Sequence, residues 1–193
     1  MSFVRLDADT ASLVLDLTGS GIPRMSYWGS RLGTTAPLDT LSGCHTPPVF
    51  QAGLDTPYHL NLFPEQGTGF KGKPALSGEK NRKHWATLFE FEKIEQDNHQ
   101  IRLFLNEPRA GLKLQLELNL DPKTGVLARR TIIRNVTDSS YRLSYCAAGA
   151  VEIPAFCTEL MSFHGCWTGE FLTRRSSFNT GITQFENRTG RTS

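Results

Sequence analysis

The fold class is decided by one stretch of the sequence, Leu112-Lys113-Leu114-Gln115-Leu116-Glu117-Leu118-Asn119-Leu120. Five leucines occupy alternate positions, and polar side chains occupy the positions between them. Because successive side chains of a strand point to opposite faces, this period of two places every leucine on one face. The stretch is therefore predicted to be an antiparallel strand with one buried face and one face in solvent.

Further strand signals lie on both sides of this stretch. Downstream, Asp121-Pro-Lys-Thr-Gly125 is predicted to be a turn, because Pro122 fixes φ and Gly125 tolerates a positive φ. Upstream, Asp97-Asn98 is predicted to be a turn between two strands. The strands predicted in this way, including shorter candidates, cover residues 13–17, 86–91, 101–105, 126–135, 141–148, 163–172 and 181–185.

The strand pattern continues from one end of the 193-residue chain to the other, and no segment has a sustained helical stripe of apolar residues. Many short strands with frequent turns are typical of a sandwich or a barrel. Two stacked sheets are the simplest way to bury strands with one apolar face. The prediction is an all-β fold, an antiparallel two-sheet sandwich, with residues 1–193 in one domain.

Residues 37–78 interrupt the strand pattern, because they contain six prolines and many glycines. A loop of this length within a compact domain is usually either functional or a linker. Aromatic and charged residues such as Tyr58, Phe63, Asp55 and Glu65 distinguish it from a plain linker. The segment is predicted to be an ordered surface excursion that contacts something.

Composition excludes several classes of protein. A hydrophobic fraction of 38% with a net charge of +2 excludes disorder and favours neither nucleic acid nor a membrane surface as partner. No apolar run reaches the roughly 18 residues of a membrane span. The first residues lack the features of a secretory signal, and the four cysteines lack the C-x-x-C spacing. Free thiols in a reducing cytoplasm are therefore expected.

Motifs that carry catalytic chemistry are missing from the sequence. It contains no nucleophile elbow, zinc-protease motif or phosphate-binding loop, and its five histidines lack metal spacing. Neither a metal nor a cofactor is expected. Asp55 and Glu65 could form a carboxylate pair for glycoside chemistry. The favoured alternative is that Asp55 caps a turn before Pro57 and that Glu65 is exposed after Pro64.

Three segments of the sequence carry motifs in a distinctive order. The first segment is Tyr27-Trp-Gly29 followed by Arg31-Leu32. The second contains Asp55, Leu60-Asn-Leu-Phe-Pro-Glu65, Gly67, Gly69-Phe70 and Pro74-Ala-Leu76. The third contains Gly165-Cys-Trp167, Gly169-Glu-Phe171, Gly181 and Glu186-Asn-Arg-Thr-Gly-Arg-Thr-Ser193. Together, in this order, they resemble the amino-terminal domain of the bacterial α-galactosidases of glycoside hydrolase family 36.

The resemblance implies a β-supersandwich that precedes a catalytic barrel, which is absent from this chain. It implies an enzyme that removes terminal α-1,6-linked galactose from melibiose- and raffinose-type oligosaccharides by a retaining mechanism. Both catalytic aspartates of the family lie in the barrel. No catalytic residue is therefore placed in this chain, which should be inactive alone. The resemblance also implies a homo-oligomer, expected to be a homotetramer; in tetrameric family members the amino-terminal domain of a neighbouring subunit contributes to the active-site mouth.

The resemblance points to a few substrate-binding residues. It implies that Asp55 accepts a hydrogen bond from a sugar hydroxyl. The family often has an Asp-Phe-Arg-x-Pro-Ala run, which here reads Gly69-Phe-Lys-Gly-Lys-Pro-Ala75. Lys71 or Lys73 could replace the arginine, although lysine lacks the planar guanidinium fork.

Two tryptophans are further candidates for sugar binding, and two other functions remain open for the chain. Trp28 and Trp167 could stack on sugars, but burial in the core or in a domain interface is favoured for a tryptophan on a strand. The alternative functions are a standalone carbohydrate-binding sandwich and an oligomerisation module with residues 37–78 as its interface arm.

Overall fold

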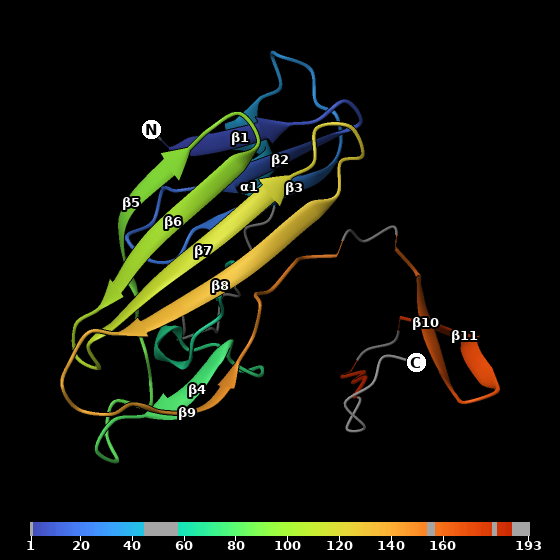
Figure 1. The fold of residues 1–193 in the computed structure, drawn as a ribbon. Coiled ribbons are helices and arrows are strands. Elements are labelled where there is room, and N and C mark those ends of the chain that lie inside the picture. The colour runs from blue at the N-terminus through green and yellow to red at the C-terminus, as the bar shows by residue number, and fades with distance from the viewer. Residues whose placement is uncertain (1, 45–57, 154–156, 179–180, 187–193) are drawn as a thin grey trace, which may run out of the picture. The chain divides into compact units, whose positions relative to one another are not determined.

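The structure is a computed structural model that describes residues 2–44, 58–153, 157–178 and 181–186. Strands predominate and pair in antiparallel fashion (Figure 1), which confirms the predicted all-β class. The chain divides into two compact units, residues 1–151 and 152–193, and each is described by itself. Within the described residues, no helix has the length and apolar character needed to cross a membrane.

The first sheet of the larger unit consists of three strands. In order across the sheet they are β1 (Phe3–Asp7), β2 (Ala11–Asp16) and β3 (Arg24–Ser30). Leu13 and Leu15 of β2 are fully buried, and Asp16 at the end of the same strand is also buried. A buried carboxylate at a strand end needs partners, and those partners belong to the site described below.

The second sheet of the larger unit has four strands. Their order is β5 (Glu90–Gln96), β6 (Gln100–Glu107), β7 (Leu112–Leu120) and β8 (Leu127–Asn135). All five leucines of β7 are buried while Lys113 and Asn119 are exposed, so the predicted alternation is confirmed. The predicted turn after β7 is confirmed too, because Asp121 accepts a hydrogen bond from Thr124 N at 2.7 Å and Gly125 has a φ of 72°.

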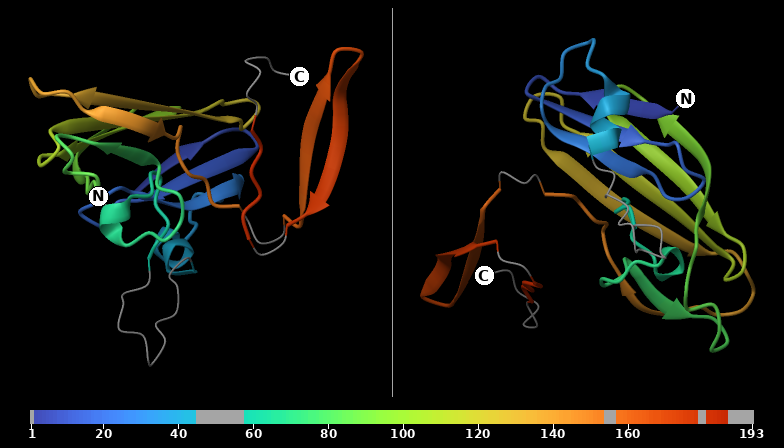
Figure 2. Two further views of the ribbon diagram at one scale, coloured as in Figure 1. Left: turned by 90° about the horizontal axis from the view of Figure 1, so that it is seen from below. Right: turned by 180° about the vertical axis from the view of Figure 1, so that it is seen from behind.

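The two sheets lie one over the other as stacked layers in Figure 2. Their apolar faces meet in one core. The core joins Val4, Leu6, Leu13 and Leu15 of the first sheet to the leucines of β6 and β7. Burying one such side chain contributes about 1.5–3 kcal/mol. The predicted two-sheet sandwich is therefore the architecture of the larger unit.

The Pro/Gly-rich region at 37–78 is more structured than expected. It contains helix α1 (Leu38–Cys44), the 3₁₀ turn η1 (Gln66–Thr68) and strand β4 (Leu76–Glu79), which pairs with β9 (Arg142–Cys146). The expectation of a surface excursion is wrong for Leu62 and Phe63, because both side chains are buried in the core. Residues that precede β4 thus belong to the core of the sandwich.

The strand predicted at residues 86–91 is wrong over its first four residues. Gly67 N donates to Thr87 O at 3.2 Å, and Phe89 N donates to the Glu65 carboxylate at 2.9 Å. These bonds use the backbone groups of residues 87 and 89 for contacts with the returning excursion rather than for a sheet ladder. A β carbon at position 67 would lie 2.3 Å from Thr87 O, so only glycine permits this approach.

The smaller unit is built on a hairpin of β10 (Glu159–Cys166) and β11 (Gly169–Ser177). The single strand predicted at 163–172 is wrong, because the hairpin turn at Trp167 and Thr168 divides that range and Thr168 has a φ of 70°. No strand forms at 181–185, which is also contrary to the prediction. The four cysteines are free, as expected.

Candidate functional site

The structure describes the two candidate lysines but not Asp55. Asp55 lies outside the described residues, so its predicted sugar contact stays a prediction. Lys71 and Lys73 are exposed in the segment between η1 and β4. The Lys73 ammonium lies 3.9 Å from the centroid of the Tyr145 ring on β9, which is a cation–π contact. This contact directs Lys73 toward β9, while Lys71 extends into solvent.

The two predicted tryptophans lie in different units and both are accessible. Trp28 on β3 is 37% exposed, and Trp167 in the β10–β11 turn is 84% exposed. Neither ring is buried in a core of this chain, so core burial is wrong for both, and burial in a domain interface stays a prediction. Their exposure leaves both indole rings able to contact another molecule, and their stacking on sugars stays a prediction.

A polar cluster around Asp16 fixes the two chain segments that border the undescribed residues 45–57. The Asp16 carboxylate accepts hydrogen bonds from the hydroxyl of Ser42 in α1 and from Arg24 in β3. The second terminal nitrogen of the Arg24 guanidinium, Nη1, lies 2.8 Å from Nδ1 of His59. One buried carboxylate thus positions both α1 and His59.

The electrostatics of this cluster favour an ionised Asp16. Burial alone would raise its pKa. Hydrogen bonds from Ser42 and Thr18 together with the charge of Arg24 outweigh burial and lower the pKa of Asp16 to about 2. The carboxylate is therefore charged at neutral pH and holds its partners by charge-assisted hydrogen bonds.

Glu65 is a buried carboxyl rather than an exposed one, so the sequence interpretation of this residue is wrong. Its side chain accepts the hydrogen bond from Phe89 N, and the residue is 1% exposed. Burial, with a smaller effect from the Glu107 charge, raises the pKa of Glu65 to about 8. Because Glu65 is enclosed in the core, it is unavailable as one half of a glycoside-cleaving carboxylate pair.

Arg129 of β8 also holds the segment that precedes β4, through the backbone of Leu62. Its guanidinium donates to Leu62 O at 2.9 Å and to Ala150 O. Burial lowers the pKa of Arg129 to about 10. Its two acceptors are backbone carbonyls, so the arginine joins a segment before β4 to a segment after β9.

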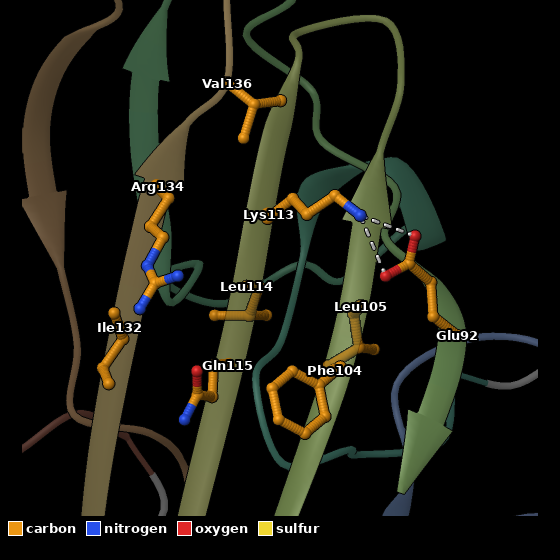
Figure 3. A pocket seen from close by; sticks show the side chains of 9 residues that line it. All are labelled: Glu92, Phe104, Leu105, Lys113, Leu114, Gln115, Ile132, Arg134 and Val136. Carbon is orange, nitrogen blue, oxygen red and sulfur yellow. Dashed lines mark hydrogen bonds and ion pairs between the residues drawn. The ribbon is translucent and has the colours of Figure 1, made fainter.

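A shallow hollow of about 140 Å³ lies on the outer face of the four-stranded sheet (Figure 3). Strand register explains its composition, because Phe104 pairs with Gln115 and Gln115 pairs with Ile132 across three neighbouring strands. The register also pairs Lys113 with Arg134. Apolar and polar side chains that face away from the core are thereby grouped together.

The sequence reasoning missed this hollow, although one signal was present. In β6 the core positions are Ile101, Leu103 and Leu105, so Phe104 is an aromatic residue at a position that faces away from the core. Ile132 breaks the alternation of β8 in the same way. Two large apolar side chains at outward positions of adjacent strands therefore mark this face.

The described residues offer little for metal or covalent chemistry. No group of three or more metal-ligating side chains gathers anywhere in the part of the chain that the structure describes. The carboxyls of Asp16 and Glu65 are both occupied by structural hydrogen bonds. Both carboxyls therefore hold parts of this chain in place.

Comparison with known proteins gives one family and several relatives. The family model described as the glycosyl hydrolase family 36 N-terminal domain matches residues 21–193. The chain is 31% identical to an α-galactosidase of Escherichia coli over 167 residues, which cover 86% of this chain and 23% of that protein. The chain thus spans about a quarter of this relative.

Solved structures with the same fold come from Geobacillus stearothermophilus. A variant of the α-galactosidase AgaA in complex with 1-deoxygalactonojirimycin has a TM-score of 0.82 at 18% identity, covering 97% of this chain and 30% of that one. An AgaA variant in complex with raffinose has a TM-score of 0.79 at 20% identity, with the same coverage of 97% and 30%. At these identities the likeness shows the fold.

Proposed function

Because the chain belongs to the N-terminal domains of glycosyl hydrolase family 36, we propose that it is the amino-terminal, non-catalytic part of an α-galactosidase. The single observation that carries this proposal is the family match over residues 21–193. The likeness to an E. coli α-galactosidase over 86% of this chain supports it. In this proposal the catalytic barrel belongs to the part of such an enzyme that lies outside these residues.

The proposed substrates are oligosaccharides with terminal α-1,6-linked galactose, such as melibiose and raffinose, cleaved with retention of configuration. The raffinose complex of the Geobacillus enzyme supports this substrate class. In the proposal the enzyme is a cytoplasmic homotetramer. Asp55, Lys71 or Lys73, Trp28 and Trp167 are the residues of this chain proposed to meet sugar, with Lys73 held toward β9 by Tyr145.

The role proposed for the described residues is positional. Asp16, Glu65 and Arg129 hold segments on both sides of the undescribed residues 45–57 against the sandwich. Buried polar groups with fixed partners, whether charged like Asp16 and Arg129 or protonated like Glu65, resist displacement, because breaking one contact leaves an unsatisfied group in the core. A rigid frame of this kind would let a domain without catalytic residues contribute contacts to a neighbouring active site.

The test compares the 193-residue chain with a polypeptide that continues into a catalytic barrel. Hydrolysis of an aryl α-galactoside is measured for both at equal concentration. We expect release of the aryl group from the longer polypeptide and none above background from the chain alone. Activity of the chain alone, or the same inactivity in both, would contradict the proposal.

A further inference from the structure

We propose that the hollow on the outer face of the four-stranded sheet binds one pyranose ring of a neutral sugar. This site is separate from the residues that the family resemblance suggested, since none of Lys71, Lys73, Trp28 or Trp167 lines it. The inference rests on the chemistry of the hollow and does not depend on the chain being part of a galactosidase. It would hold equally for a standalone binding module.

The apolar part of the hollow suits the carbon-bound face of a sugar ring. Phe104, Ile132 and Val136 supply apolar surface from β6, from β8 and from the residue just after β8. The Lys93 ammonium lies 4.4 Å from the centroid of the Phe104 ring and is not among the residues that line the hollow, so the ring is held by a contact outside it. Aromatic and aliphatic side chains of this kind pack against the C–H groups of a pyranose.

The polar part of the hollow offers both donors and acceptors. Lys113 reaches from β7 to Glu92 on β5 and donates to its carboxylate at 3.0 and 3.2 Å. The register of β5 slips between Phe91 and Lys93, and this bulge leaves Glu92 outside the regular pairing. Gln115 donates its amide nitrogen to Glu117 at 2.8 Å, which leaves its amide oxygen as an acceptor.

Arg134 adds hydrogen-bond donors that no partner in the described chain uses. Its guanidinium extends along β8 toward Ile132 in Figure 3. Within the described part of the chain it makes no hydrogen bond or ion pair, and the residue is exposed. A guanidinium has five N–H donors in a fixed plane, which suits two adjacent hydroxyl oxygens.

The combination of these groups selects the ligand class. An anion would meet the Glu92 carboxylate, and an ammonium ion would meet Lys113 and Arg134. A purely apolar ligand would desolvate the Arg134 donors without replacing their hydrogen bonds. A neutral polyhydroxylated ring can accept from Arg134, donate to Glu92 and Gln115, and pack on Phe104. The volume of about 140 Å³ is below the roughly 300–1,000 Å³ of drug-sized pockets, so one ring is the expected occupant.

The experiment is an NMR titration of the 193-residue chain with D-galactose and with raffinose, followed by amide shifts. We expect saturable shifts centred on residues 104, 115, 132 and 134, with a Kd of about 1–10 mM, as a shallow, solvent-open site implies. Arg134→Ala and Gln115→Ala should each weaken binding at least about threefold, because each loses hydrogen bonds to the ligand. Arg130→Ala is the matched control, since Arg130 lies on the same strand and face outside the hollow.

Three results would overturn the proposal. The first is the lack of saturable shifts with both sugars in a chain whose spectrum shows a folded sandwich. The second is saturable shifts that map elsewhere or that persist unchanged in both variants. The third is saturation of the hollow by sulfate in place of sugar, which would make it an anion site. Each result leaves the galactosidase assay unaffected, so this inference and the proposed function fail independently.

Discussion

The Asp16 carboxylate at the end of β2 accepts a hydrogen bond from the Ser42 hydroxyl in helix α1, 26 residues further along the chain. Asp16 is 2% exposed and Ser42 is 9% exposed, so this contact is enclosed. Helix α1 has only seven residues and is too short to be stable alone. The helix therefore depends on a carboxylate that belongs to the sheet.

Replacing Asp16 should destabilise the fold in a pH-dependent way. The pKa of Asp16 is about 2 in the folded chain against 3.8 ordinarily, so its contribution is complete above pH 4 and is lost as pH falls toward 2. That contribution is about 2 kcal/mol by linkage. We expect Asp16→Asn to lower the free energy of unfolding by about 2–4 kcal/mol at pH 7. Urea unfolding at pH 7 and pH 3 measures the change in stability. Asp9→Asn is the control, because Asp9 is exposed.

Glu65→Gln should raise the free energy of unfolding at alkaline pH, whereas Asp16→Asn lowers it at neutral pH. The pKa of Glu65 is raised from 4.5 to about 8, so its stabilisation is complete below pH 4.5 and is lost as pH rises through 8. A neutral glutamine avoids this loss, and the variant should exceed the wild-type chain in unfolding free energy by about 2–4 kcal/mol at pH 8.5. Thermal or urea unfolding across pH 4–9 gives the comparison. Exposed Glu90→Gln should leave the pH profile as it is, and a wild-type profile that is flat from pH 4.5 to 8 would contradict the prediction.

Gly67→Ala should loosen the contact between the excursion and residue 87. The new β carbon would lie 2.3 Å from Thr87 O and 3.2 Å from the Leu88 β carbon, so the backbone must shift. We expect the free energy of unfolding to fall by about 1–3 kcal/mol. The matched substitution is Gly33→Ala, where no atom lies within 4 Å and the change should stay within about 0.5 kcal/mol. Equal effects of the two changes in urea unfolding would contradict the close approach.

Asp55→Ala tests the residue that the family resemblance selected. In a polypeptide that includes the catalytic barrel, we expect a raised KM or weaker transglycosylation with little change in unfolding temperature. The loss of one hydrogen bond to a charged acceptor is about 1.5–3 kcal/mol, roughly a 10- to 150-fold effect. Kinetics with raffinose and thermal unfolding are measured on the same sample. Unfolding of the variant would identify Asp55 as a turn residue instead.

Strands with one buried face were predictable from sequence because burial imposes a strict period. The leucines of β7 alternate through nine residues, and slipping this strand by one position would expose all of them. The turn at Asp121–Gly125 was predictable for a local reason, since its hydrogen bonds join neighbouring residues. These features depend on interactions that a short stretch of sequence already contains.

The features that were missed depend on contacts between distant residues. Glu65 follows a proline in a Pro/Gly-rich segment, and its burial is decided by Phe89 N, 24 residues away. Lys73 meets Tyr145 across 72 positions, and only the pairing of β4 with β9 brings them together. Of the candidate site, the outward Phe104 was readable from alternation, whereas its neighbours Gln115 and Ile132 required the strand register.

The hydrogen bonds of Arg129 predict part of the order in which the chain folds. Its two acceptors, Leu62 O and Ala150 O, lie 67 and 21 residues from it in sequence. Closing a long loop costs chain entropy before the contact can stabilise the fold. Contacts between residues far apart in sequence therefore tend to form late. The excursion can be fastened only after β8 has paired with β7 and brought the guanidinium into place. Amide protons such as Ala150 N, which donates to Leu62 O at 3.1 Å, should therefore gain protection from hydrogen exchange after those of β7.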